Sequence, residues 1–226
     1  MKKLSLLVGG LALSTLALAQ KPSAETPFSL EGQLGWNAST LSFNAPSIRF
    51  RYFLQDNLAV RATLGVNNNK TVDNYFENEG DNTGATGEYI TKTGGWGLAL
   101  GAEYHFEGTD KLSPYAGVDI MFGGGSLNEE GTNAADGFGY VADYTYTNEQ
   151  KSSMVGVNLV AGTDYYFAEN FYLGLELGLG WRSNTWKEGT EVETFAGTTT
   201  TTRSNEGKSS SLGNNVIGTF RLGWRF

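Results

Sequence analysis

Strict alternation of apolar residues with polar or small ones is the feature that most constrains this fold. The clearest case runs from Phe171 to Arg182, where an apolar side chain occupies every second position. A period of two is typical of a β-strand with one apolar face. The same alternation recurs along the chain, so we count eight strands. The eight segments are 28–37, 48–52, 58–64, 96–106, 116–122, 155–165, 171–182 and 216–226.

The links between these segments alternate in length. Tight links separate long polar segments, and only the first loop, at 38–44, is of intermediate length. We therefore predict an all-β fold, an eight-stranded antiparallel up-and-down transmembrane β-barrel with short periplasmic turns and long extracellular loops. The tight links are 54–57, 107–113 and 168–170, and the long segments are 67–92, 123–151 and 183–212.

A water-soluble barrel or sandwich with its apolar face inward is the alternative fold. Aromatic residues at both ends of the apolar face favour the membrane barrel. Phe171 and Trp181 are separated by roughly 25 Å of height at about 3.3 Å per residue and a tilt near 40°. Glycine, at 31 residues of 226, also fills the polar face, as a narrow lumen requires. The expected aromatic girdle is Phe28, Trp36, Tyr52, Trp96, Phe106, Phe122, Phe171, Trp181 and Trp224.

The N-terminus has the form of a secretory signal peptide. Lys2 and Lys3 precede an apolar run, and residues 17–19 read Ala-Leu-Ala, a small-x-small cleavage site. A membrane-anchoring helix is the alternative, but about 15 apolar residues are too few to span a bilayer. We expect residues 1–19 to be removed, with Gln20 as the first residue of a single barrel domain, 20–226.

Composition excludes several classes of function. The chain has no cysteine, which rules out disulfides, cysteine-bound zinc and thiol nucleophiles, and it has one histidine. The net charge is −8, and loss of Lys2 and Lys3 makes it −10, whereas a general nucleic-acid binder carries the opposite sign. We expect no cofactor and no nucleic-acid partner.

The C-terminal segment resembles the signature of outer-membrane proteins that the barrel-assembly machinery reads. Segments 52–58 and 111–115 also resemble turns of the small outer-membrane β-barrel domain family, the OmpA-transmembrane, OmpX and OmpW-like group. The resemblance implies a monomeric barrel in the cell outer membrane of a Gram-negative organism, in contact with outer-membrane lipid and lipopolysaccharide. It implies no activity. The residues of the assembly signal are Phe220, Leu222, Trp224 and Phe226.

Charged residues on the polar face are expected to meet inside the barrel. Eight strands leave a bore that side chains can just fill, and unpaired charges in such a space are costly. Two interpretations remain open, a structural plug and a narrow or gated pore. The expected ion network is Glu31, Arg49, Arg51, Arg61, Glu103, His105, Asp119, Asp164, Glu176, Arg221 and Arg225.

No catalytic site is predicted. His105 and Glu103 share a face and form the one acid–base candidate, but no nucleophile is placed with them, and no pairing resembles the serine and histidine of lipid A deacylases or palmitoyltransferases. The loops are acidic, but neither 81–83 nor 128–130 has the ligand spacing of an EF-hand. No metal site is predicted, and whether the loops bind calcium stays open.

Two parts of the long segments also have strand character. Residues 138–146 alternate aromatic and polar side chains, and 194–203 is a threonine-rich run around Ala196 and Gly197. Both are expected to rise above the membrane, either as stiffened loops or as a docking surface for a protein or glycan. A count of ten membrane strands, with a hairpin at 137–147, is the less favoured alternative.

Overall fold

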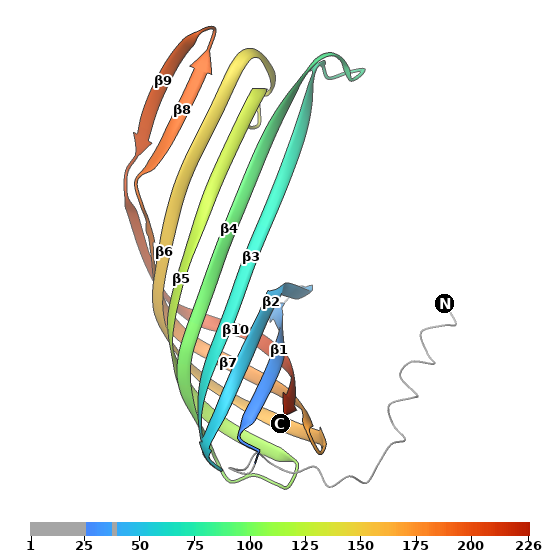
Figure 1. The fold of residues 1–226 in the computed structure, drawn as a ribbon, viewed down its shortest axis with the longest axis vertical. Coiled ribbons are helices and arrows are strands. Elements are labelled where there is room, and N and C mark those ends of the chain that lie inside the picture. The colour runs from blue at the N-terminus through green and yellow to red at the C-terminus, as the bar shows by residue number, and fades with distance from the viewer. Residues whose placement is uncertain (1–25, 38–39) are drawn as a thin grey trace, which may run out of the picture.

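The computed structural model describes residues 26–37 and 40–226, and side chains except at 34–46 and 214–219. The described chain is almost entirely β-strand (Figure 1). The strands are β1 (Phe28–Asn37), β2 (Thr40–Gln55), β3 (Leu58–Asn78), β4 (Thr83–His105), β5 (Leu112–Ala135), β6 (Gly139–Ala168), β7 (Phe171–Trp186), β8 (Gly189–Phe195), β9 (Thr198–Ser204) and β10 (Gly207–Arg225).

Eight of these strands form an antiparallel ring, which confirms the predicted fold. Each strand from β1 to β6 pairs with the next, β7 pairs with β10, and β10 pairs with β1. The closing pair runs from Ser29 opposite Arg225 to Trp36 opposite Gly218. The remaining two strands, β8 and β9, form a hairpin outside the ring, and β8 pairs with β6 over residues 144–149.

The polar segments predicted as long loops are mostly strand. β3 pairs with β4 without a break from Leu58 to Phe76, and β5 pairs with β6 from Leu112 to Thr132. We call the upper part of four strands, together with β8 and β9, the extension. It comprises residues 67–78 of β3, 83–95 of β4, 124–135 of β5 and 139–152 of β6. The extension rises far above the ring in Figure 1. In β3 this part is exposed at almost every position, and its backbone pairing continues although the apolar alternation has ended. Residues 137–147 therefore add no membrane strand.

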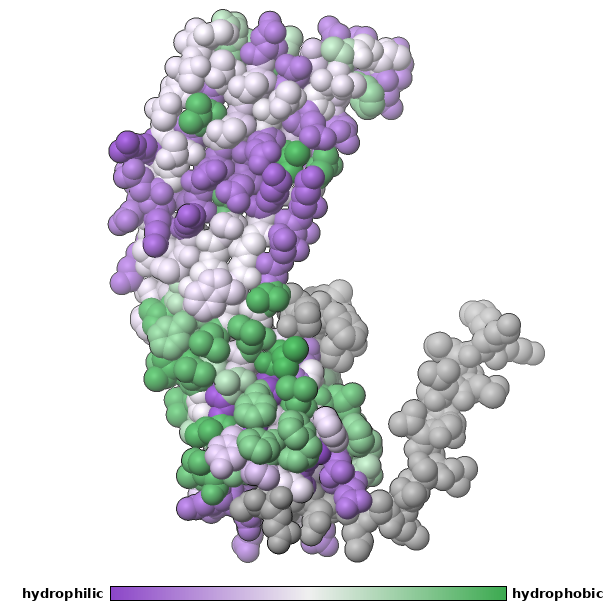
Figure 2. All heavy atoms as spheres, in the orientation of Figure 1, coloured by the Kyte–Doolittle hydropathy of each residue, from purple (hydrophilic) through white to green (hydrophobic). Residues whose placement is uncertain are grey.

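Burial in the ring is inverted relative to a water-soluble protein. Leu175, Leu177 and Val157 are 41%, 48% and 43% exposed, whereas Arg51 and Glu31 are 0% and 1% exposed. Figure 2 shows apolar residues gathered in a band across the lower half of the visible face, below a hydrophilic extension. An apolar band of this kind faces lipid, because in water it would be a very large exposed patch.

The residues of the expected girdle lie on the outer face at the two edges of this band. Trp96 is 51% exposed at one edge and Phe106 is 51% exposed at the other. The side chain of Trp36 lies outside the described residues. The other members, all exposed, are Phe28, Tyr52, Phe122, Phe171, Trp181 and Trp224.

The predicted signal peptide, residues 1–19, and the predicted first mature residue, Gln20, lie outside the described part of the chain. Over residues 26–37 and 40–226, no helix is long and apolar enough to cross a membrane.

Candidate functional site: the ion network of the lumen

All eleven residues of the expected ion network are buried in the ring. Strand register alone would set two of them against each other, because Arg51 and Arg61 are direct cross-strand partners on β2 and β3. Like charges in that position repel. Glu103 of β4 lies between them, 2.9 Å from Arg51 Nε and 2.9 Å from Arg61 Nη1, so one carboxylate compensates both guanidinium groups.

Glycines let side chains two strands apart meet across the strand between them. Asp164 of β6 and Arg221 of β10 both pair with Gly174 of β7, and Arg221 Nη2 donates to Asp164 Oδ1 at 2.6 Å above that glycine. A Cβ at Gly174 would lie 2.5 Å from Arg221 Nη2. We call the glycines in this position seat glycines. They are Gly174, Gly101 between Arg61 and Asp119, Gly162 between Tyr115 and Glu176, and Gly223 between Glu31 and Tyr172.

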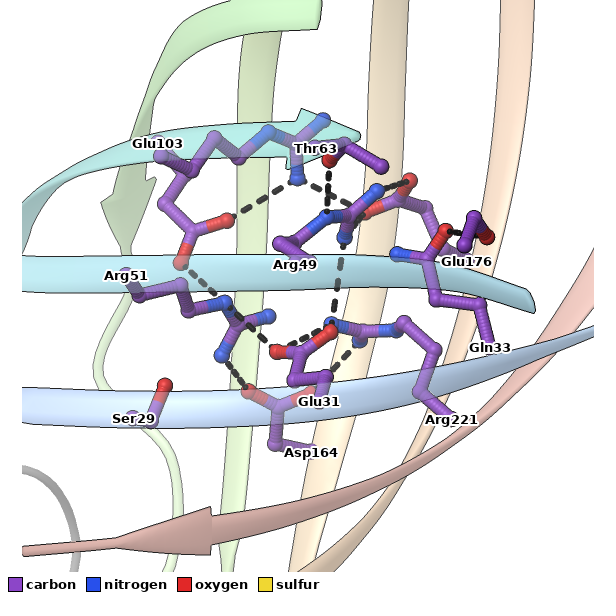
Figure 3. Close-up of polar contacts among 12 residues, drawn as sticks. Ser29, Glu31, Gln33, Arg49, Arg51, Thr63, Glu103, Asp164, Glu176 and Arg221 are labelled. Atoms are coloured by element: carbon purple, nitrogen blue, oxygen red, sulfur yellow. Dashed lines mark hydrogen bonds and ion pairs between the residues drawn. The ribbon is translucent and has the colours of Figure 1, made fainter. Parts of the chain in front are cut away.

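Arg51 crosses the lumen and connects its walls. Starting from β2, it lies 2.8 Å from Glu31 Oε1 of β1 and donates to Asp164 Oδ2 of β6 at 2.5 Å, besides its contact with Glu103 of β4 (Figure 3). Its guanidinium carbon is 5.2 Å from the centre of the Tyr115 ring. One side chain thus contacts residues from strands on opposite sides of the ring.

Arg61 and Arg49 form a second group of ion pairs, which share the carboxylate of Glu176. Arg61 makes a two-point contact with Asp119, at 2.8 and 2.7 Å, and also donates to Glu176 Oε2 at 2.7 Å. Arg49 makes a two-point contact with the same Glu176, at 2.8 and 2.9 Å. Tyr115 donates its hydroxyl hydrogen to Glu176 Oε2 at 2.6 Å. Paired donor geometry of this kind makes guanidinium–carboxylate contacts strong.

The network is nearly balanced in charge. Four guanidinium groups, of Arg49, Arg51, Arg61 and Arg221, face five carboxylates, and every carboxylate contacts at least one of them. Buried ion pairs of this kind stabilise little relative to an apolar core, but loss of one partner leaves a buried charge and is strongly destabilising. Loss of any one of these arginines is therefore expected to destabilise the ring.

Aromatic rings fill the lumen below the network, near the periplasmic turns. Tyr166 and Tyr172 are fully buried with ring centres 5.2 Å apart, and Phe53 lies 5.3 Å from the ring of His105. Arg225 lies over Tyr166 at 5.7 Å and is hydrogen-bonded to Thr26, which places its guanidinium group in this layer.

Three tyrosines, Tyr115, Tyr166 and Tyr172, belong to the site although they were not predicted as site residues. The alternation placed Tyr115 and Tyr172 on the polar face, which was the available signal. Tyr172 donates to Glu31 Oε1 at 2.8 Å over Gly223.

The expectation that no nucleophile accompanies His105 was wrong. Ser113 Oγ lies 2.8 Å from His105 Nδ1, and Glu103 Oε1 lies 3.1 Å from Nε2, which is a serine–histidine–carboxylate set with the two ring nitrogens exchanged relative to a serine-protease triad. Ser113 comes from β5, and sequence alone does not give the register that brings it to β4. The serine is 2% exposed and the histidine 5%, and Glu103 is also paired with two arginines. The set is therefore shielded from substrate in this conformation.

Above the network the lumen widens into a cavity of about 240 Å³. Its walls include Arg49, Asp119 and Glu176 from the ion network, together with Met121, Met154 and Arg182. Throughout residues 26–37 and 40–226, no three histidine, cysteine, aspartate or glutamate side chains are grouped to hold a metal ion.

Several solved structures are similar to this chain. The N-terminal β-barrel domain of Pseudomonas aeruginosa OprF is 16% identical with a TM-score of 0.37, over 89% of this chain and 98% of that one. Ail, the attachment invasion locus protein of Yersinia pestis, is 12% identical with a TM-score of 0.35, over 88% and 97%. CarO2 of Acinetobacter baumannii is 10% identical with a TM-score of 0.38, over 88% and 98%.

A search of curated proteins found no match. A family profile does match, over residues 33–180, which is well over half of the chain and includes most of the ring. The chain therefore belongs to the putative OmpA-OmpF-like porin family and is an outer-membrane β-barrel protein.

Proposed function

We propose that the protein is a non-enzymatic, monomeric outer-membrane barrel with a closed lumen, whose extension serves a structural, adhesive or partner-binding role at the cell surface. The observation that carries the closed lumen is the position of Arg51, which contacts carboxylates of β1, β4 and β6 across the bore. The buried rings of Tyr166 and Tyr172 add a second barrier toward the periplasm.

Planar-bilayer recording tests the closed lumen. Purified protein is expected to give no stable conductance steps, because the proposed plug of ion pairs and rings would block a continuous water path. Arg51→Ala, which removes the crossing side chain, serves as the opened comparison and is expected to give more frequent current fluctuations. Reproducible steps of one size from the unmodified protein would contradict the proposal.

A narrow or gated pore is the second candidate. The observation in its favour is the cavity of about 240 Å³ in the lumen, whose walls include the Arg49–Glu176 ion pair. If that pair opens as a gate, Arg49→Ala and Glu103→Ala change the conductance and its preference for cations over anions. Unchanged currents in both variants would remove this candidate.

The outer surface of the extension supports contact with outer-membrane lipid and lipopolysaccharide. An open groove of about 660 Å³ lies just above Trp96, with Lys92, Lys151 and Lys187 among its lining residues. Amines at the edge of an apolar band are placed to meet lipid phosphates. The double variant Lys151→Gln/Lys187→Gln tests this contact, with Lys208→Gln as the control. Less lipopolysaccharide is expected to co-purify with the double variant than with the control, and equal amounts would argue against the contact.

Export and assembly belong to the same proposal. Cleavage after Ala19 predicts a mature chain that begins at Gln20, which intact-mass measurement of the membrane protein checks. The assembly signal is expected to act through its outward side chains, since Phe220, Leu222, Trp224 and Phe226 are all exposed on β10 and at its end. Phe226→Ala is then expected to slow insertion by the barrel-assembly machinery, and an unchanged insertion rate would speak against that role.

A further inference from the structure

A separate cavity lies on the inner face of the extension. It has a volume of about 230 Å³, several times the roughly 30 Å³ share of one water molecule. Its walls combine aromatic rings with carboxylates, and none of its lining residues is a lysine or arginine. The rings are those of Tyr89, Phe138, Tyr144 and Tyr146, and the carboxylates are those of Glu129 and Asp136.

The two central rings are brought together by the same device as in the lumen. Tyr89 of β4 and Tyr146 of β6 both pair with Gly131 of β5, and their ring centres lie 6.1 Å apart at an angle of 24°. A Cβ at Gly131 would lie 3.2 Å from atoms of both tyrosines. Gly131 is therefore a seat glycine for an aromatic pair.

Carboxylates surround this pair along the same cross-strand row. Asp73 pairs with Tyr89 on one side, and Glu193 pairs with Tyr146 on the other. In the next row, Glu129 accepts a hydrogen bond from Asn148 Nδ2 at 2.8 Å, which holds one carboxylate at the cavity wall. The inner face here is thus aromatic and negatively charged.

The tyrosine hydroxyls respond to that negative field. Burial, and then the carboxylates of Glu191 and Glu129, raise the pKa of Tyr146 to about 12. Burial and Glu129 also raise the pKa of Tyr89. A phenol is neutral at physiological pH even at its ordinary pKa of about 10, and the raised pKa values keep these two rings uncharged to still higher pH.

We propose that this cavity binds a substituted ammonium group, with the ring faces of Tyr89, Tyr144 and Tyr146 around the cation and Glu129 and Asp136 balancing its charge. Aromatic faces attract organic cations, and the attraction grows as the cation loses its water. The proposal rests on the proposed surface role of the extension and gives that role a chemical class of ligand.

Calorimetric titration with choline tests the proposal on the full chain. The protein is purified in a glucoside detergent, because phosphocholine detergents carry the group under test. Choline is expected to bind at least about tenfold more tightly than its uncharged tert-butyl analogue, since the analogue has the same shape without the cation. Equal binding of the two would mean a merely apolar cavity, and absence of choline binding would overturn the proposal.

Three variants separate the cage from its surroundings. Tyr146→Leu removes a ring and keeps an apolar side chain, and Glu129→Gln removes a charge while keeping an oxygen that can accept from Asn148. Each is expected to weaken choline binding by about fivefold to thirtyfold. Glu149→Gln, one residue beyond Asn148 on the opposite face of β6, is the matched control and is expected to bind as the unmodified protein does.

Circular dichroism and the gel mobility of the folded barrel show whether each variant keeps its structure. Unchanged choline affinity in folded Tyr146→Leu and Glu129→Gln would overturn the cage. If magnesium ions weaken choline binding as strongly as choline analogues do, the site is a simple acidic surface, and this outcome also contradicts the proposed cage. None of these outcomes alters the conductance test, so failure here is distinguishable from failure of the closed lumen.

Discussion

The inner face of the molecule changes character along its length. In the ring, inward carboxylates are matched almost one for one by guanidinium groups, whereas in the extension Glu129 and Asp136 line a cavity with tyrosines and with no arginine or lysine among its lining residues. The ring encloses its charges, so it must neutralise them internally. The extension is an open sheet that meets water, so its charges can remain available to a ligand.

Loss of one arginine from the ring should show the largest effect of this difference. Arg61→Met leaves Asp119, Glu103 and Glu176 facing one another and is expected to lower the free energy of unfolding by about 3–5 kcal/mol. Urea unfolding in detergent micelles measures it. Arg203→Met removes an exposed partner of Glu188 in the extension and should cost about 1 kcal/mol or less. Equal losses in the two variants would break the comparison.

The outer faces should differ in the same sense, with a smaller effect. Leu175→Arg places a charge in the apolar band and is expected to destabilise the barrel in a bilayer by about 2–4 kcal/mol. Val72→Arg on the outer face of β3 in the extension should change stability by no more than about 0.5 kcal/mol. The free energies of folding of Leu175→Arg and Val72→Arg into lipid vesicles, each compared with that of the unmodified protein, measure this difference. A tolerated Leu175→Arg would mean that this face does not meet lipid.

The smallest expected effect is a titration in the extension. The absorbance difference between the protein and Tyr146→Phe should show tyrosinate formation with a midpoint near pH 12, because burial and nearby carboxylates disfavour the phenolate. The folded pKa lies above the unfolded value of about 10, so stability from this group is present below that pH and is lost as pH rises through about 12. Glu129→Gln removes a like charge and should lower the midpoint, whereas Glu149→Gln should leave it unchanged. A midpoint near 10 would show that the ring is open to water.

Much of the ring could be predicted from the sequence because lipid imposes a period of two. Leu173, Leu175 and Leu177 alternate with Gly174 and Glu176, and that pattern alone separates the outer face from the inner face. The extension could not be predicted as strand in the same way, since residues such as Asn68, Lys70 and Asn74 continue β3 where both faces are wet. Hydrogen bonding between backbones continues there without any hydrophobic signature.

Which inward residues meet also lay beyond the sequence. A period of two tells which face of its own strand a side chain occupies. The contact between Ser113 and His105 also depends on the register between β4 and β5, which the period does not give. The same holds for Asp164 and Arg221, which meet only because Gly174 lies between them. Glycine on the polar face was visible as a composition bias, and the register converts it into particular pairs.

The closing pair of β1 with β10 has a consequence for the order of events in folding. Ser29 and Arg225 are partners at nearly opposite ends of the described chain, so this seam has the longest loop to close and is expected to form late. Until it forms, both end strands expose unpaired backbone, and Glu31 lacks the partner that Arg221 supplies. Completion of the barrel therefore joins two events in one kinetic step, the zipping of the last ladder and the arrival of a second guanidinium group at a carboxylate that Arg51 already contacts.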